Sequence, residues 1–239
     1  MTDTPAPATS TEALTVHVNA DAQQAWIMLR EPAKLLQWHG WDSDSLKDEV
    51  DTIYFTNAVE DADHRSLTVD GGDTFQLHPE QGGISISVER ANDDPTVTEG
   101  WVTFLQQLRF ALERHPNSTR RTLYFSGASK DGRSIISTLG LDDVRAPGED
   151  YSASLPTGID ITGKVWFRSA NQLGLTVHAY AERGDGLLIL GDLPGGESIA
   201  IASTYELGAK QLHDVWERWD EFRGVHYPDS EPIVTSTLE

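Results

Sequence analysis

The sequence contains no cysteine. This absence excludes disulfide bonds, cysteine nucleophiles and zinc–thiolate sites. Long apolar runs are absent as well, because no window reaches the roughly 18 consecutive apolar residues of a membrane-spanning helix. The stretch from Met1 to Glu12 carries no basic side chain, whereas a secretory signal begins with one. We therefore expect a cytoplasmic protein with a short disordered tail at residues 1–13.

Basic residues are scarce relative to acidic ones. The 239-residue chain has 18 lysines and arginines against 38 aspartates and glutamates, a formal net charge of −20. Such a surface repels phosphate backbones and anionic membranes, so we expect neither nucleic acid nor a membrane as a partner. Only the segment 109–145 carries more basic than acidic residues, a pattern typical of a solvated helix end and linker. The acidic composition also favours a salt-tolerant or GC-rich bacterial source.

Motifs for metals, phosphates and serine hydrolases are missing too. The eight histidines form no His-x-x-x-His or His-Glu-x-x-His pair, so no metal site is predicted. No Gly-Lys-Ser/Thr phosphate loop and no Gly-x-Ser-x-Gly elbow occurs. We expect neither a cofactor nor a metal.

Hydrophobic periodicity and turn residues divide the first half into strands and helices. A β-branched strand at 15–18 precedes a helix at 22–29, for which Asn19 and Asp21 are candidate caps. Short antiparallel strands and a long amphipathic helix follow. The further elements predicted are a short helix at 32–38, strands at 50–56, 66–69, 74–77 and 84–90, and a helix at 99–115 capped by Thr98.

The second half repeats this order of elements. It begins with a strand at 121–125 and ends with a helix at 209–222 that carries Trp216 and Trp219 on one face. Between them the pattern predicts a helix at 131–139 and strands near 161–168, 173–180, 187–190 and 198–205. Because the order strand, helix, meander, long helix occurs twice, we predict an internal duplication. The alternative is one continuous α+β domain with two unrelated long helices.

Three segments resemble the SRPBCC superfamily, also called START-like or birch-pollen-allergen-like. They are the strand followed by DAQQAW at 21–26, the short helix ending LLQWHGW at 35–41, and EGW at 99–101 opening a helix with Leu105, Leu108 and Leu112 behind it. The branch that holds polyketide cyclases and activators of the heat-shock chaperone ATPase looks nearest. The segment 197–222 looks like a second such ending with a degenerate opening.

The resemblance implies an α+β helix-grip fold, in which a curved antiparallel sheet wraps a long C-terminal helix. Together with the repeated element order, it predicts a duplicated fold with domains at 14–118 and 119–228, and a tail at 229–239. Such folds generally hold an apolar cavity between the sheet and the last helix. Lipid carriers, ligand sensors, cyclases, hydrolase-like proteins and co-chaperones share the fold, so fold alone does not fix function.

The predicted ligand is therefore a small hydrophobic or aromatic molecule, which the protein would carry, sense or sequester. Two alternatives remain open: a cyclase- or hydrolase-like enzyme that uses polar cavity residues such as His39 and Tyr54, and an acidic interaction protein that modulates a chaperone. Ordinary core packing is the competing interpretation of the aromatic residues. The candidate ligand-binding residues are Trp26, Trp38, His39, Trp41, Tyr54, Trp101, Leu105 and Leu108.

Overall fold

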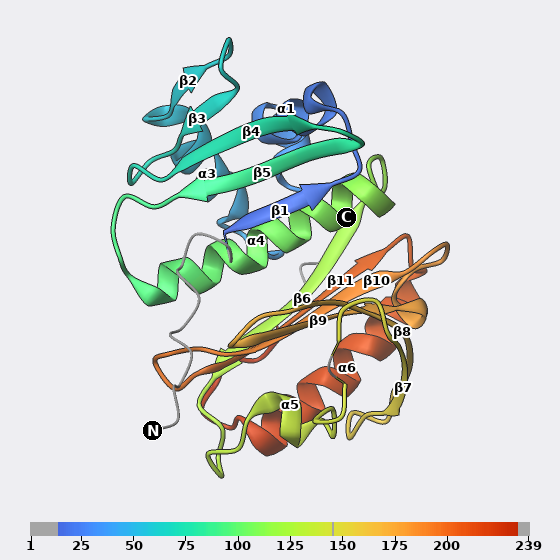
Figure 1. Cartoon of the computed structure of the whole chain (residues 1–239). Coiled ribbons are helices and arrows are strands. Elements are labelled where there is room, and N and C mark those ends of the chain that lie inside the picture. The colour runs from blue at the N-terminus through green and yellow to red at the C-terminus, as the bar shows by residue number, and fades with distance from the viewer. Residues whose placement is uncertain (1–13, 145, 234–239) are drawn as a thin grey trace, which may run out of the picture.

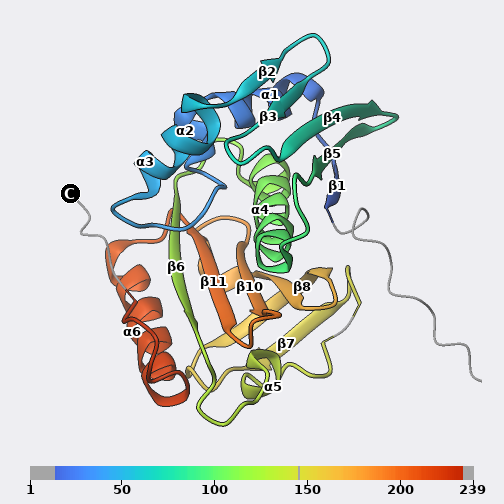
Figure 2. The same ribbon diagram turned by 90° about the vertical axis from the view of Figure 1, so that its left-hand side faces the viewer.

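The computed structural model describes residues 14–144 and 146–233. The polypeptide forms four layers, in the order sheet, long helix, sheet, long helix (Figures 1 and 2). The tail predicted at 1–13 lies outside the described residues, and so do residues 234–239 of the tail predicted at 229–239. None of the described helices combines the length and the apolarity needed to cross a membrane.

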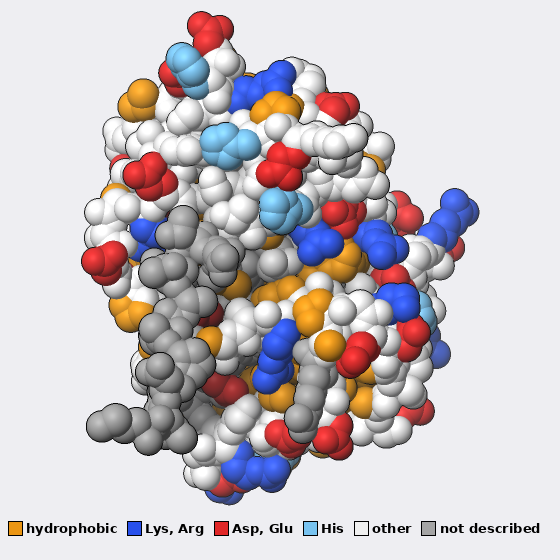
Figure 3. Space-filling view, in the orientation of Figure 1, with side chains coloured by type: hydrophobic (Ala, Val, Ile, Leu, Met, Phe, Trp, Pro, Cys, Tyr) orange, Lys and Arg blue, Asp and Glu red, His pale blue; other side chains and the backbone are white. Residues whose placement is uncertain are grey.

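The first sheet, sheet A, has five antiparallel strands in the order β1-β5-β4-β3-β2. Its residues alternate in burial as a half-buried strand requires: Phe75 and Leu77 are buried, whereas His78 is exposed. Histidine and acidic side chains are visible on the outward face of this sheet (Figure 3). The strands are β1 (Thr15–Val18), β2 (Val59–Asp61), β3 (Ser66–Thr68), β4 (Thr74–Glu80) and β5 (Gly83–Glu89).

Three short helices and a π-helical turn connect β1 to β2. The first helix begins with a capping box, in which Asp21 accepts from the backbone of Gln24 at 2.7 Å and Gln24 accepts in return from the backbone of Asp21. The segments are α1 (Ala22–Arg30), α2 (Pro32–Leu35), α3 (Leu46–Asp51) and the π-helical turn η1 (Thr52–Thr56).

The predicted strand at 50–56 is wrong, because this segment is helical in α3 and η1. Its β-branched and aromatic residues favour a strand locally. However, Leu46, Val50 and Tyr54 recur every four residues and all three are buried. A helix places these three side chains on one face, so tertiary packing overrides the local preference.

The first long helix, α4 (Pro95–Arg114), starts earlier than the predicted residue 99. Asp94 is the cap in place of the predicted Thr98: its carboxylate accepts from the backbone of Thr96 at 2.8 Å, and Pro95 occupies the first turn. The helix is buried on opposite faces. Leu105 packs in the core beneath sheet A, whereas Phe110 meets Trp166 of the second sheet edge to face, at a centroid distance of 5.1 Å.

The second sheet, sheet B, has six strands in the order β6-β11-β10-β9-β8-β7. The helix predicted at 131–139 is reduced to the single turn α5 (Ile135–Thr138). The strands are β6 (Arg120–Gly127), β7 (Asp150–Ser154), β8 (Asp160–Arg168), β9 (Gln172–Val177), β10 (Gly186–Asp192) and β11 (Ser198–Tyr205), accompanied by the 3-10 turn η2 (His178–Tyr180) and the final helix α6 (Ala209–His226).

Sheet B is buried on both faces at its centre, because α4 covers one face and α6 the other (Figure 2). In β11, Ile199 and Ile201 belong to the core around α4, whereas Ala200 and Ala202 belong to the core around α6. The helix α4 is therefore packed between the two sheets.

The prediction of an α+β protein with antiparallel sheets and a long C-terminal helix is confirmed. Within the described residues, the one parallel pairing is an isolated bridge between Ala181 and Tyr205. In each sheet the first strand of its half lies beside the last, and the other strands follow in reverse chain order. The edge strands β2 and β7 are not predicted by the sequence pattern.

Candidate functional site

A pocket of about 370 Å³ opens beside the first turns of α4. We call it the α4 pocket. Its apolar wall and its polar rim come from five separate stretches of the first half. The wall consists of Ile53, Val97, Trp101 and Phe104, and the rest of the lining consists of His39, Glu49, Asp70, Gly71, Asp73, Asn92 and Gly100.

The helical repeat of α4 places three wall residues on one face. Val97, Trp101 and Phe104 are spaced by four and three residues, so their side chains lie above one another along the helix. Gly100 lies beside them, and a Cβ atom at this position would meet no atom within 4 Å. The missing side chain thus leaves open space in the pocket.

A buried carboxylate fixes the indole of Trp101. The indole Nε1 donates to Asp73 Oδ2 at 2.5 Å. The other oxygen, Asp73 Oδ1, accepts from Arg90 Nε at 3.2 Å and from the backbone of Ala91 at 2.8 Å. Trp101 also meets Phe75 edge to face, at a centroid distance of 5.1 Å. One wall of the pocket is therefore held in a single orientation.

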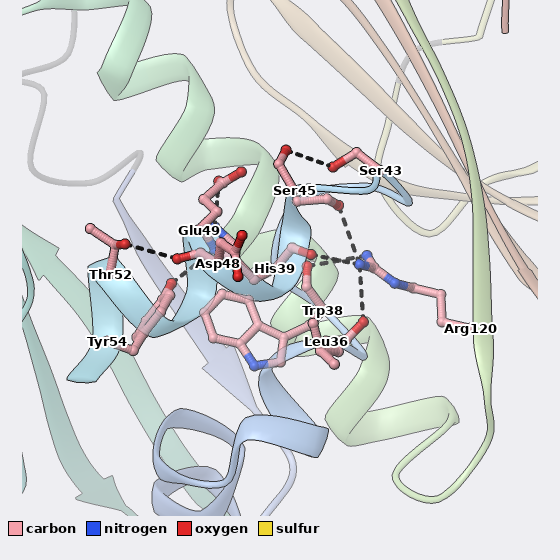
Figure 4. A network of polar contacts seen from close by, with 11 residues as sticks. Leu36, Trp38, His39, Ser43, Ser45, Asp48, Glu49, Thr52, Tyr54 and Arg120 are labelled. Carbon is pink, nitrogen blue, oxygen red and sulfur yellow. Dashed lines mark hydrogen bonds and ion pairs between the residues drawn. The ribbon is translucent and has the colours of Figure 1, made fainter. Parts of the chain in front are cut away.

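Three polar side chains, those of Tyr54, His39 and Glu49, form a hydrogen-bonded row beside the pocket (Figure 4). The Tyr54 hydroxyl lies 2.9 Å from His39 Nδ1, and His39 Nε2 lies 3.0 Å from Glu49 Oε1. An ionised carboxylate only accepts hydrogen bonds, so His39 carries its proton on Nε2. Its Nδ1 then accepts the hydrogen bond that the Tyr54 hydroxyl donates. The imidazole is 1% exposed, whereas the Glu49 side chain is 44% exposed.

The protonation states of Tyr54, His39 and Glu49 follow from burial and hydrogen bonding. Burial lowers the pKa of His39, which keeps the ring neutral at neutral pH. The hydrogen bond from His39 lowers the pKa of Glu49, so its carboxylate is ionised. Burial raises the pKa of Tyr54 well above its ordinary value, so it stays protonated. Both ring nitrogens of His39 are occupied, and the group able to take a proton from a ligand is the Glu49 carboxylate.

Arg120, at the start of β6, holds the loop that carries His39. Its buried guanidinium donates to the backbone oxygens of Trp38, His39 and Gly40 at 3.2, 2.7 and 3.2 Å. It also donates to Gln107 Oε1 on α4 at 2.6 Å. Burial lowers the pKa of this arginine. The second half of the chain thus positions a loop of the first half (Figure 4).

The structure brings three of the predicted ligand-binding residues to this site. His39 and Trp101 line the α4 pocket, and Tyr54 lies buried behind His39. Trp38, Leu105 and Leu108 are fully buried core residues outside the lining of this pocket. Trp26 packs, partly buried, against the same core.

Trp41 lies in a second pocket, of about 320 Å³, which we call the Trp41 pocket. Its indole stacks on Tyr124 of β6 at a centroid distance of 3.6 Å and an interplanar angle of 10°. The remaining lining residues are Asp42, Ser43, Asp44, Thr122, Phe125, Ser126, Glu231 and Pro232. Trp41 therefore lines a different pocket from Trp101, although its ring lies 6.5 Å, centroid to centroid, from Phe104 of the α4 pocket.

Sequence reasoning misses most residues of the α4 site, among them Glu49, Asp73, Phe104 and Arg120. Glu49 is hidden because its segment resembles a strand; the four-residue repeat of buried positions would have revealed the helix. Asp73 ends a Gly-rich turn, and aspartates in such turns are usually exposed to solvent, so its buried position is not expected. No local signal marks Arg120, because all its acceptors are distant in sequence. No group of side chains suited to a metal ion occurs among the described residues.

No protein-family model matches the chain, and no curated protein matches its sequence. Among solved structures, the chain resembles the crystal structure of DynU16, a protein from the dynemicin biosynthetic locus. The two share 13% sequence identity with a TM-score of 0.28, over 86% of this chain and 91% of the other. This similarity is too slight to support an inference about fold or function.

Proposed function

We propose that the protein binds a small apolar or aromatic molecule in the α4 pocket. The observation that carries this proposal is the wall of Ile53, Val97, Trp101 and Phe104 around an opening of about 370 Å³. Ligand pockets typically have volumes of about 300–1,000 Å³ and mostly apolar walls. Burial of apolar ligand surface against this wall stabilises a complex by roughly 25 cal/mol per Å².

The fixed wall supports the same proposal. Asp73 accepts a hydrogen bond from the Trp101 indole, and Phe75 packs against the indole ring. A ligand would therefore meet an indole of fixed orientation. A pre-formed site loses little conformational entropy on binding. The helix-grip plan is part of this proposal, with α4 as the helix that sheet A covers.

A second candidate is a cyclase- or hydrolase-like enzyme, which the hydrogen-bonded row of Tyr54, His39 and Glu49 favours. Glu49 is ionised, half exposed and oriented by a buried histidine, which are the properties of a general base. In this candidate Glu49 would take a proton from the bound molecule, while His39 and Tyr54 would position its carboxylate. The third candidate, an interaction protein that modulates a chaperone, would be favoured if the α4 pocket bound nothing.

We further propose that the ranges 14–118 and 119–228 are two copies of one plan. The matching strand order of sheets A and B supports this proposal. The second copy fills its sheet–helix space with side chains: Trp219 Nε1 donates to Tyr180 at 2.7 Å, and Phe125 and Tyr227 pack beside them.

The binding proposal is tested by titrating the protein with a panel of flat, neutral aromatic compounds and measuring heat and tryptophan fluorescence. We expect saturable binding that the Gly100→Leu variant abolishes, because the new side chain occupies open space in the pocket. Gly224→Leu is the matched control: Gly224 is also a helical glycine with open space around it, but it lies on α6.

Both leucine variants should fold, since replacing a helical glycine removes a destabilising residue. Equal binding by the two variants, or no binding by the wild type, would contradict the proposal. A neutral ligand found in this way also tests the catalytic candidate: conversion of the ligand should disappear in Glu49→Gln. Absence of any conversion by the wild type would favour a binding protein.

A further inference from the structure

We infer that the α4 pocket selects molecules that carry a positively charged nitrogen on an apolar body. This inference rests on the proposed binding function and names its ligand class. It follows from the charges around the pocket and from the partners that each charge has.

One carboxylate of the pocket, Asp73, already has its negative charge compensated by a cation. Its two oxygens accept from Arg90, from a backbone amide and from the indole of Trp101. It is also buried, so it serves the wall and is closed to a ligand.

Glu49 differs, because its Oε1 accepts from a neutral histidine and from no cation in the described structure. Asp70, another residue of the lining, accepts from the amide of Asn57 at 3.2 Å. Neither interaction cancels a negative charge. Among the described residues that line the pocket there is no lysine or arginine. Two uncompensated carboxylates therefore face one apolar opening.

The aromatic wall adds to this preference. Phe104 is partly exposed and meets Trp101 edge to face at a centroid distance of 5.9 Å. Aromatic faces attract ammonium groups, and the attraction grows when the cation is desolvated. An amine could place its charge near Glu49 and its apolar body against Trp101 and Phe104. A carboxylate ligand would meet like charge at the same place.

The overall charge of −20 does not explain this arrangement by itself. Acidic side chains at the surface are screened by salt within about 10 Å at 0.1 M ionic strength. Glu49 instead forms part of the lining and is fixed by a buried side chain, so its effect on a bound ligand is local. Its neighbour Asp48, an exposed residue of the same helix, is not part of the lining.

The test compares three compounds of nearly equal shape: 2-naphthylmethylamine, 2-naphthalenemethanol and 2-naphthoate. Affinities are measured by calorimetry at neutral pH, with the full chain, at low and at moderate salt. We expect the amine to bind about tenfold more tightly than the alcohol, as a charge-assisted hydrogen bond predicts, and the carboxylate to bind most weakly. Because the contact with Glu49 is local, moderate salt should reduce the advantage of the amine only slightly.

Two variants locate the effect. Glu49→Gln should bring the ratio of amine to alcohol affinity close to one. Asp48→Asn removes the same charge from the same helix outside the pocket and should leave the ratio unchanged. Circular dichroism and thermal unfolding confirm that both variants are folded.

The outcomes separate the two proposals. If the alcohol and the amine bind equally to the wild type, the charge preference is wrong while the binding function stands. If the preference persists in Glu49→Gln, or is lost equally in Asp48→Asn, the general surface charge causes it and the inference is overturned. If none of the three compounds binds, the proposed function fails and the inference fails with it.

Discussion

The guanidinium of Arg120 donates a 2.7 Å hydrogen bond to the backbone oxygen of His39, although 81 positions separate the two residues. Every acceptor of this buried cation is a carbonyl or amide oxygen, from the loop around His39 and from Gln107. The loop that carries His39 to the α4 pocket therefore depends on the strand that begins the second half.

Replacement of Arg120 by methionine should destabilise the protein by about 3 kcal/mol. Methionine keeps most of the aliphatic stem but leaves buried carbonyl oxygens without donors, at a cost of about 1–3 kcal/mol each. Urea unfolding measures the loss. Arg133→Met, at an exposed position, is the control and should change stability by less than about 0.5 kcal/mol. A loss below about 1 kcal/mol for Arg120→Met would show that water replaces the guanidinium.

Much of the fold could be predicted from the sequence, because local patterns determine it. The strand at 15–18 and the strand at 198–205 have the predicted bounds. Alternating β-branched residues and glycine turns mark such strands without reference to distant contacts. The segment 50–56 could not be assigned by this rule, since the packing of Tyr54 against His39 outweighs its β propensity.

The site could be predicted only in part, for a related reason. The tryptophan at 101 falls on the apolar face of a recognisable helix, so its position near a pocket is accessible to sequence reasoning. The hydrogen-bond partners of Asp73 and Arg120 are distant in sequence. Such hydrogen bonds produce no periodic pattern in the sequence from which they could be predicted. Leu105 and Leu108 share the helix with Trp101 but lie further along it, where they are completely buried in the core.

Acid should destabilise the protein through His39. Burial lowers the pKa of His39 below its ordinary value of 6.5, so the unfolded chain binds a proton before the folded one does. Stability is then fully present above about pH 6.5 and falls as the pH drops towards the folded pKa, by at most about 1.4 kcal/mol per pH unit.

A His39→Gln variant isolates this contribution, because burial lowers the pKa of His115 as well and gives a slope of the same sign. Urea unfolding at about pH 7.5 and about pH 5.5 should show a smaller loss for the variant than for the wild type. Equal losses would mean that His39 is protonated in the folded state.

Truncation of Trp101 to alanine should cost about 3–5 kcal/mol, as large aromatic truncations in cores do. The change removes the contact with Phe75 and leaves Asp73 without its indole donor. Thermal or urea unfolding measures it, and Trp101→Phe, which keeps an aromatic ring but not the donor, should cost less. A loss under about 0.5 kcal/mol for Trp101→Ala would contradict the buried position of this ring.

The two halves should unfold together, in one transition. Chains longer than about 150 residues often unfold in several steps, but α4 is shared: Phe110 is fully buried and contacts Trp166 of β8 and Tyr205 of β11, with centroid distances of 5.1 and 5.8 Å. Loss of sheet B would expose this face of α4, and loss of sheet A would expose the other, so neither half keeps a complete core alone.

Calorimetry should therefore give a van't Hoff enthalpy close to the calorimetric one. Phe110→Ala should lower the free energy of unfolding by about 3–5 kcal/mol and still give a single transition. Two resolved transitions in the wild type, only one of which responds to Phe110→Ala, would show that the halves are independent folding units joined by a helix that belongs to one of them.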